Sequence, residues 1–326
     1  MFAAPAAASP AGRVTVVPLR GAPTPSLLAR VAAGQVGGVI LLGSWSSPQA
    51  TAAAVAQLQH VACAKLGSPL LVGVDQEGGS VRRLTWASPT LAAASMETTA
   101  VARAQALAAA RAMKQAGIAI DFAPVADTIS TPRSFLGTRA FGSDPATVAR
   151  LAAAFVGGLQ AGGVAAAAKH FPGLGSAVAS TDDRPVTIAR SAAFLTARLA
   201  PFTAAISAGA ELVMVSNASY PALDPSGAPA VFSGRIVTGL LRGQLGFNGI
   251  VVSDALDAGA VARVPDEPGK ALAAGVDLLL YSRTTASEAA YAELVRDARS
   301  ATVRAELAAA IQRIDALKAS LGLSCS

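Results

Sequence analysis

Histidine and cysteine are scarce in this chain of 326 residues, which has two of each. A zinc site made only of cysteines is therefore excluded, and a mixed site would need all four residues, Cys63, Cys325, His60 and His170, to converge on one place. An iron–sulfur cluster held by four thiolates is excluded as well. We predict no metal centre.

Charged residues are also few, at 14% of the chain against 52% hydrophobic residues, and the mean hydropathy is +0.48. These averages are typical of a membrane protein, but the pattern is not. The longest nearly uncharged stretch, residues 151–168, is mostly Ala and Gly, contains Gln160 and breaks at Gly162-Gly163, whereas a span needs ~20 strongly apolar residues. We predict a helix of small residues followed by a buried strand, and no membrane span.

Basic runs and aromatic residues are missing too. Lys and Arg exceed Asp and Glu by 26 to 20, a formal charge of +6, yet the arginines are scattered and aromatic residues make up 5%. Nucleic-acid binding needs basic residues gathered on one face, with aromatics for single strands. We predict no nucleic-acid partner, although weak attraction to an anionic polymer such as cell wall fits the charge.

The first twelve residues are rich in Ala and Pro and lack the charged start and long apolar core of a secretory signal. We predict a flexible tail over residues 1–12 and one domain over 13–326. Two locations stay open: the cell envelope or exterior, with a signal removed, or the cytoplasm. Cys63 closes a predicted helix near the start and Cys325 follows the last one, so in a closed barrel these two are expected to form a disulfide.

Short runs rich in Val, Ile and Leu alternate with Ala-rich segments that are predicted to be helical, as in a parallel sheet built from βα units. Eight such runs occur: Val14–Val17, Gly38–Leu42, Leu70–Val74, Ile118–Ala123, Val164–Ala168, Leu212–Val215, Ile250–Val252 and Val276–Tyr281. Helix limits punctuate them, including Ser47-Pro48, Asp144-Pro145 and Ser233 as starts. The fold class is therefore α/β, a single (β/α)8 TIM-type barrel.

Polar side chains follow most of these runs, where a barrel of this type builds its active site. The third run leads into Asp75, the fourth into Asp127 and then Arg139, the fifth into Lys169-His170, the sixth into Ser216-Asn217 and the seventh into Ser253-Asp254. Two strand-end carboxylates, Asp75 and Asp254, suit binding of sugar hydroxyls and cleavage of glycosidic bonds. A buried Lys169 needs a charged partner, which favours a polar site.

Other motifs are weaker. Residues 173–178 begin like a dinucleotide-binding loop but lack the third Gly and the later acidic residue. No G-x-S-x-G sequence indicates a serine hydrolase. His60 is predicted to face solvent from a helix. An oxidoreductase or a serine hydrolase is therefore a poor fit.

Three motifs, GVDQEGG (73–79), KHFPG (169–173) and GIVVSDAL (249–256), resemble those of the bacterial β-N-acetylhexosaminidases of glycoside hydrolase family 3. DFAPVAD (121–127), GTRAFGSDP (137–145) and SYPALDP (219–225) match as well, and the resemblance runs from about residue 12 to about residue 320. The resemblance implies that Asp254 is the catalytic nucleophile. It implies these substrate contacts: Asp75, Arg83, Arg139, Lys169 and His170.

The sequence departs from the family pattern after KHFPG. The usual continuation, HG-x4-D-[ST]-H, ends in a histidine on a mobile loop that acts as general acid/base, oriented by the Asp two residues before it. Here Leu174 replaces one histidine, Ser180 replaces the Asp and Asp182 stands at the catalytic position. Asp182 can take over the role if burial or the neighbouring Asp183 raises its affinity for a proton. Asp183 is a second stand-in.

Two further interpretations remain open, namely a glycan-binding protein that has lost efficient acid catalysis and a loop that recruits some other residue. We favour the enzyme, because the nucleophile and the sugar-binding positions are kept. The expected function is retaining hydrolysis of a terminal β-linked N-acetylhexosamine in cell-wall or chitin-fragment turnover, with no cofactor. The expected partner is a carbohydrate, such as a muropeptide, and the expected state is a monomer. A β-glucosidase of the same family is the nearest alternative.

Overall fold

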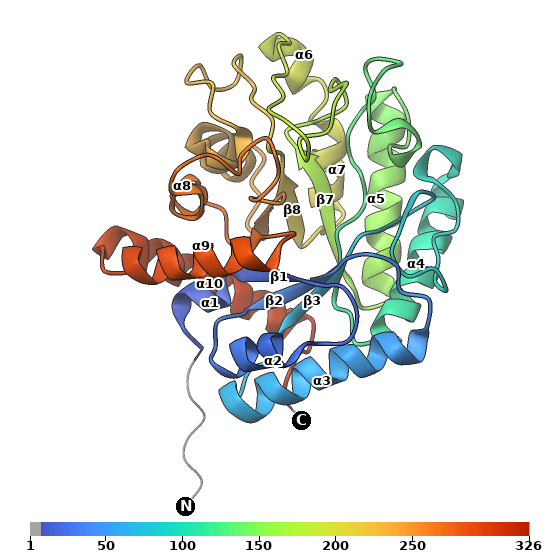
Figure 1. The fold of residues 1–326 in the computed structure, drawn as a ribbon. Helices are drawn as coiled ribbons and strands as arrows, with labels where there is room; N and C mark the ends of the chain where they lie inside the picture. Colours follow the sequence, from blue (N-terminus) through green and yellow to red (C-terminus); the bar gives the residue numbers. More distant parts are fainter. Residues whose placement is uncertain (1–7, 326) are drawn as a thin grey trace, which may run out of the picture.

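The computed structural model describes residues 8–325, and eight of its strands form one parallel sheet rolled into a barrel (Figure 1). The strands run in the order β10–β1–β2–β3–β6–β7–β8–β9, and a parallel bridge between Val252 and Leu278 joins the two ends. They are β1 (Thr15–Leu19), β2 (Gly38–Leu41), β3 (Leu71–Val74), β6 (Ile120–Asp121), β7 (Ala165–Phe171), β8 (Leu212–Val215), β9 (Ile250–Ser253) and β10 (Leu279–Leu280). The predicted (β/α)8 barrel is confirmed.

Each predicted run overlaps one barrel strand, but the bounds differ. Strand β7 continues past Ala168 to Phe171, because Lys169 still pairs with Met214 before the register shifts. Lys169 and His170 are therefore strand residues rather than loop residues. Strands β6 and β10 are only two residues long, shorter than their apolar runs. A separate hairpin, β4 (Gln76–Gly78) with β5 (Val81–Arg82), follows β3.

Helices surround the strands (Figure 1). They are α1 (Pro10–Arg13), α2 (Pro25–Ala32), α3 (Pro48–Leu66), α4 (Thr99–Gln115), α5 (Pro145–Ala161), α6 (Ala192–Thr196), α7 (Ala200–Ser207), α8 (Glu267–Ala274), α9 (Thr284–Asp297) and α10 (Ala301–Ser320), with a π-helix η4 (Arg235–Gln244) and short 3-10 turns η1 (Ala93–Ser95), η2 (Gly137–Arg139) and η3 (Ala230–Phe232). Ser47 and Asp144 cap α3 and α5 through their side chains, and a Pro follows each, as predicted.

The predicted tail over residues 1–12 is too long. Residues 1–7 lie outside the described residues, but Pro10–Arg13 form α1, capped by the Ser9 side chain. Ala11 and Gly12 are buried, and a Cβ at Gly12 would lie 2.0 Å from the carbonyl oxygen of Gly34. The low-complexity sequence is compatible with this packing because Ala and Gly permit the close approach.

The expected disulfide is present between Cys63 in α3 and Cys325 after α10, with a Cα–Cα distance of 5.3 Å. The carboxyl end of the chain accordingly lies beside α3 in Figure 1. An ion pair between Arg13 and Asp315 also ties the segment before β1 to α10. The first and last helical layers of the barrel are therefore neighbours, as the closed topology requires.

The apolar content of the chain lies in this barrel. All four residues of each of the strands β2, β3, β8 and β9 are buried, as expected for a parallel sheet covered by helices. The stretch 151–168 divides between α5 and β7, as predicted. Among residues 8–325, we find no helix with the length and hydropathy of a membrane span.

Candidate active site

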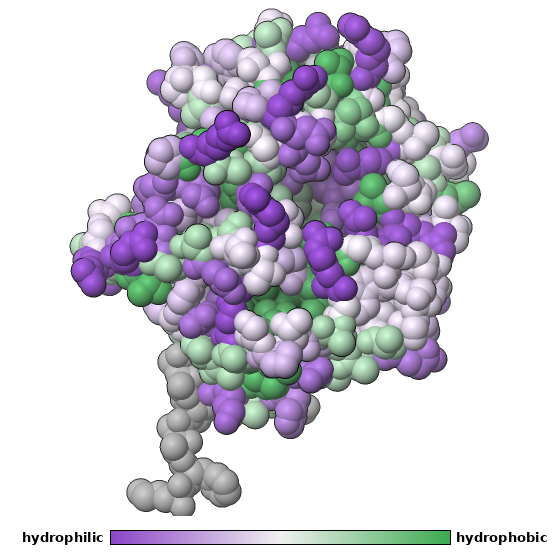
Figure 2. Space-filling view, in the orientation of Figure 1, coloured by the Kyte–Doolittle hydropathy of each residue, from purple (hydrophilic) through white to green (hydrophobic). Residues whose placement is uncertain are grey.

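A pocket of about 750 Å³ opens where the loops after the barrel strands meet. It is lined by every residue that the sequence analysis assigned to catalysis or substrate binding: Asp75, Arg83, Arg139, Lys169, His170, Asp182 and Asp254. Figure 2 shows hydrophilic side chains bordering a hollow on this side of the molecule. The structure thus brings the predicted residues together, while their individual roles remain predictions.

Lys169 is the central cation of the pocket and is 2% exposed. Its Nζ donates to Asp75 Oδ1 at 2.6 Å and lies 2.7 Å from Glu77 Oε1. Burial alone would lower the pKa of Lys169, but the Asp75 and Glu77 carboxylates outweigh it and raise that pKa. The lysine is therefore held as a cation by two strand-end carboxylates, and these ion pairs offset the free-energy cost of burying its charge.

Glu77 is a site residue that the sequence analysis did not single out. It receives two hydrogen bonds from Arg139, from Nε and Nη2, each of 2.8 Å. Burial alone would raise the pKa of Glu77, but Lys169 and Arg139 together lower it to about 2. Glu77 lies two residues after Asp75, and residues two apart on an extended segment point the same way. That spacing is the signal that would have found it.

His170 is paired with Asp127, which the sequence analysis noted at a strand end without assigning it a role. The imidazole Nδ1 lies 2.8 Å from Asp127 Oδ2, and the same oxygen accepts the His170 backbone N–H at 3.1 Å. The other oxygen accepts the N–H of Leu174 at 2.5 Å. The carboxylate partner fixes the orientation of the imidazole ring through Nδ1. Asp127 thereby orients His170 and anchors the following loop.

Asp254 follows β9 directly and is half-buried. Its Oδ1 accepts the N–H of Ala255 at 2.8 Å. Burial raises its pKa; His170 works against the rise and the Asp182 carboxylate adds to it. The group is therefore a carboxylate whose ionisation responds to its neighbours, which is typical of reactive acids.

Asp182 lies on the loop of residues 174–183, which we call the Asp182 loop. It lines the pocket but its residue is exposed, so the burial that would help to hold a proton is not there. Its carboxylate is one of the causes that raise the pKa of Asp254. Asp183, the alternative acid, is exposed and does not line the pocket.

Two more sequence predictions have clear positions. Arg83 directly follows β5 and lines the pocket, and its carbonyl accepts the N–H of Trp45 at 2.8 Å. His60 is exposed on α3, as predicted for a solvent-facing helix residue.

Asp121, at the end of β6, is a fully buried carboxyl group that sequence reasoning missed as part of the site. Its Oδ1 accepts the N–H of Gln76 at 3.0 Å, the residue between Asp75 and Glu77. Burial raises the pKa of Asp121 to about 8. The contact fixes the backbone that presents both of those carboxylates.

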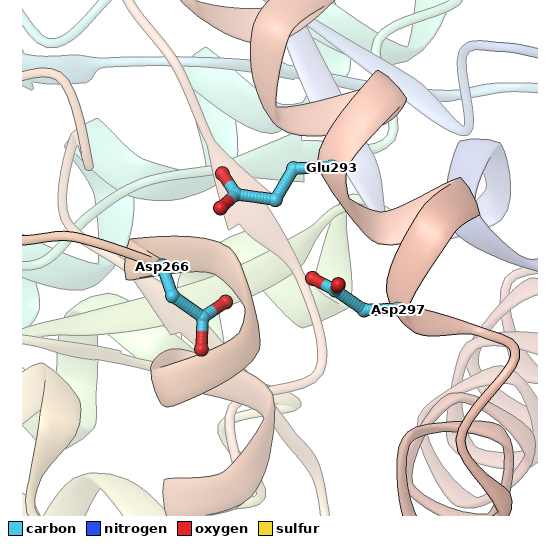
Figure 3. A group of neighbouring side chains, drawn as sticks. All are labelled: Asp266, Glu293 and Asp297. Atoms are coloured by element: carbon cyan, nitrogen blue, oxygen red, sulfur yellow. The ribbon is translucent and has the colours of Figure 1, made fainter.

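A second group of acids lies elsewhere. Asp266, before α8, and Glu293 and Asp297, on α9, point their carboxylates toward one another (Figure 3). One oxygen of each lies within 4.8 Å of the others, and no further group of this kind occurs among residues 8–325. None of the three lines the pocket, and Asp266 is exposed. The group is separate from the candidate active site.

Comparison with known proteins supports the family resemblance that the motifs indicate. Residues 15–317 match the family described as "Glycosyl hydrolase family 3 N terminal domain". A protein named "Beta-hexosaminidase" from Xanthomonas campestris pv. campestris (strain B100) is 36% identical over 245 residues, which is 69% of this chain and 72% of the relative.

Solved structures agree. A β-N-acetylhexosaminidase from Beutenbergia cavernae superposes with a TM-score of 0.87 at 34% identity, with 95% of this chain and 97% of that chain covered. A glycoside hydrolase family 3 β-N-acetylglucosaminidase from Paenibacillus sp. FPU-7 gives a TM-score of 0.89 at 30% identity over 96% of this chain, which spans 62% of that one. With the family match over nearly the whole barrel, the resemblance seen in the motifs is confirmed, and the chain belongs to glycoside hydrolase family 3.

Proposed function

We propose that this protein is a retaining glycoside hydrolase that releases terminal β-linked N-acetylhexosamine, chiefly N-acetylglucosamine. The observation that carries the proposal is that Asp254 and Asp182 line the same pocket as the Lys169 cluster. The relatives named β-hexosaminidase support the choice of sugar. The reaction needs a nucleophile, an acid that becomes a base, and groups that hold the sugar.

Sugar binding falls to the charged groups on the β3 and β7 side. Lys169, Arg139 and Asp75 are fixed by the ion pairs described above, and hydrogen bonds from charged groups to hydroxyls are the stronger kind. His170, oriented by Asp127, and Arg83 complete the set. Because these groups are held in place before the sugar arrives, they orient it without further ordering cost.

Asp254 is the proposed nucleophile. The N–H of Ala255 orients the carboxylate through Oδ1, and the other oxygen attacks the anomeric carbon as the glycosidic bond breaks. The product of this step is a covalent glycosyl-enzyme on Asp254. Water then attacks the same carbon, which returns the carboxylate and releases the sugar with its original anomeric configuration.

Asp182 is the proposed acid/base. In its protonated form it gives its proton to the leaving oxygen, and as a carboxylate it then takes a proton from the attacking water. Its place in the pocket and its electrostatic effect on Asp254 support the role. Two observations favour the alternative, a homologue that binds glycans with weak catalysis. Asp182 is exposed, and Leu174 stands where the family pattern has a histidine.

The test of substrate and class is release of nitrophenol from 4-nitrophenyl β-N-acetylglucosaminide and from 4-nitrophenyl β-glucoside. We expect turnover of the first and little of the second. The reverse preference would identify a β-glucosidase, and binding of N-acetylglucosamine oligomers without turnover of either would identify a glycan-binding protein. Proton NMR of the first-formed anomer tests retention, since an initial α-anomer would contradict the covalent mechanism.

The proposed setting is the cell envelope or exterior, in turnover of cell-wall or chitin fragments by a monomer. The Cys63–Cys325 disulfide supports this location, because structural disulfides persist in oxidising compartments. Intact-mass measurement of the protein from its native host, without reduction, tests the location, since two free thiols would contradict it. Light scattering tests the monomer.

A further inference from the structure

The Asp182 loop is held at its start by the segment after β6. The N–H of Leu174 donates to Asp127 Oδ1 at 2.5 Å, and the N–H of Ser130 donates to the carbonyl of Gly175 at 3.1 Å. A Cβ at Gly175 would lie 1.9 Å from the carbonyl oxygen of Thr128, so the two backbones are in direct contact. The first half of the loop therefore packs against fixed structure.

The second half of the loop is held by the segment that follows Asp254. The N–H of Gly259 donates to the carbonyl of Asp182 at 2.7 Å, and the N–H of Ala260 donates to the carbonyl of Thr181 at 3.0 Å. The N–H of Asp182 donates to Ser180 Oγ at 3.1 Å. Both backbone polar groups of Asp182 are thus bonded, which fixes the starting point of its side chain.

Gly259 permits this contact because it has no side chain. A Cβ built there would lie 2.4 Å from the carbonyl oxygen of Asp183 and 2.8 Å from that of Asp182. Both atoms belong to the backbone, so no rotamer change relieves the clash, and any other residue would push the loop away. The backbone φ of Gly259 lies outside the left-handed region, so space alone demands glycine here.

Residues 254–260 connect this contact to the barrel. The N–H of Asp254 donates to the carbonyl of Val215 in β8 at 3.0 Å, and the N–H of Leu256 donates to the carbonyl of Leu280 in β10 at 2.9 Å. One short segment therefore carries Asp254 at its anchored end and holds the Asp182 backbone at its other end. The relative position of the two carboxyl groups depends on it.

We propose that Gly259 is a positioning residue, which sets the distance of Asp182 from the glycosidic oxygen by holding the Asp182 loop against the segment after Asp254. The inference rests on the proposed role of Asp182 as acid/base. It predicts a specific defect: a displaced acid fails to protonate the leaving oxygen, and this failure affects poor leaving groups and spares good ones.

The test compares Gly259→Ala with Gly234→Ala in the full chain. Gly234 is a matched control, since a Cβ there meets nothing within 4 Å and its φ is −60°. For each variant, kcat/KM is measured on N,N′-diacetylchitobiose, which has a poor leaving group, and on 4-nitrophenyl β-N-acetylglucosaminide, which has a good one. We expect Gly259→Ala to lose ~10-fold or more on the first and less than ~3-fold on the second.

Asp182→Ala and the double variant Asp182→Ala/Gly259→Ala complete the design. We expect Asp182→Ala to show the same selectivity more strongly, and the double variant to be no worse than Asp182→Ala, because Gly259 acts only through Asp182. Equal losses on both substrates, or a Gly259→Ala variant that matches Gly234→Ala, would overturn the positioning role while leaving a selective Asp182→Ala defect, and with it the proposed function, in place.

Absence of any selective loss in Asp182→Ala would instead remove the acid/base assignment, and the positioning role with it. If Gly259→Ala fails to fold, Ser180→Ala takes its place, because it removes the hydroxyl that accepts the Asp182 N–H at 3.1 Å. A smaller loss, confined to diacetylchitobiose, is then expected. No selective loss in a folded Ser180→Ala variant would overturn the proposal.

Discussion

The two sides of the pocket differ in whether their charged side chains are paired with opposite charges. On the β3 and β7 side, Lys169 and Arg139 are interleaved with Asp75 and Glu77 at 2.6 to 2.8 Å. On the side of β9 and the Asp182 loop, the acids are Asp254 and Asp182, and among residues 8–325 the ion pairs include neither.

This difference matches the two proposed roles, holding the sugar on one side and reacting with it on the other. Compensated charges keep one ionisation state: the pKa of Glu77, which burial alone would raise, is lowered to about 2 by its cationic partners. Acids outside the ion pairs respond to their neighbours: burial and the Asp182 carboxylate raise the pKa of Asp254, and His170 works against the rise. Two-carboxylate catalysis uses acids whose surroundings set their pKa values apart, which fits the proposed roles of Asp254 and Asp182.

The largest expected effect is on the reacting side. Asp254→Asn should lower kcat by roughly 10³-fold or more, because an amide is a far weaker nucleophile than a carboxylate. The fold should survive, since the new side chain can still accept the Ala255 N–H. Steady-state kinetics and thermal unfolding check this. Asp224→Asn is the matched control, a buried acid outside the pocket. Substantial activity in folded Asp254→Asn would exclude Asp254 as nucleophile.

On the binding side, the expected effect is on stability as well as activity. Lys169→Met leaves Asp75 without its cation and Glu77 with Arg139 alone, and breaking a buried pair in this way costs about 3 kcal/mol. Urea unfolding measures this loss. Lys318→Met is the control: burial lowers the pKa of Lys318 to about 8, and its Nζ has a single long contact with Ser68 Oγ at 3.3 Å. Similar losses of unfolding free energy in both variants would mean that the ion pairs of Lys169 add no stability beyond that of any buried lysine.

A smaller effect concerns pH. The nucleophile must be ionised, so kcat/KM should fall as the pH drops through the raised pKa of Asp254, above its ordinary value of 3.8. Asp182→Asn removes a charge that raises this pKa, so the acidic limb should move to lower pH, by roughly one unit or less. Measurement on a 4-nitrophenyl glycoside keeps the rate detectable. Asp183→Asn, outside the pocket, should leave the limb in place. An unmoved limb in Asp182→Asn would show that the two acids are independent.

The smallest effect tests whether uncompensated acids mark function at all. The Glu293 pKa is raised by burial and by Asp266 and Asp297, the acids of the cluster in Figure 3, none of which lines the pocket. At a pH above 4.5, the ordinary pKa of a glutamate, the ionised form of Glu293 therefore destabilises the folded protein. Glu293→Gln should stabilise the protein at neutral pH by about 0.3 kcal/mol, with unchanged kcat, and the gain should vanish below pH 4.5. A loss of activity would show that this cluster contributes to catalysis although none of its residues lines the pocket.

Much of this arrangement could be predicted from sequence because the apolar runs and the motifs are local. Each barrel strand begins in an apolar run, and the side chains that follow the runs converge in any parallel barrel. Asp75, Lys169 and Asp254 were found in this way.

Contacts between distant segments could not be predicted in the same way. Glu77 gains its meaning from Arg139, and Asp121 from its backbone contact with Gln76, and only barrel closure brings these pairs together. The polar residues at the end of β7 hid the continuation of that strand, since sequence patterns end strands where charge begins. The buried α1 was missed because Ala, Pro and Gly carry little pattern of their own.

The Cys63–Cys325 bond closes residues 63–325 into one covalent ring. Asp75, Lys169 and Asp254 all lie inside it, whereas β1 and β2 lie on the segment outside. A protease that cuts one exposed loop of the ring, for example near Val178, leaves no detached fragment. Such a nicked molecule would still run as one species until it is reduced, and could keep its pocket assembled after damage that would divide an unbridged chain.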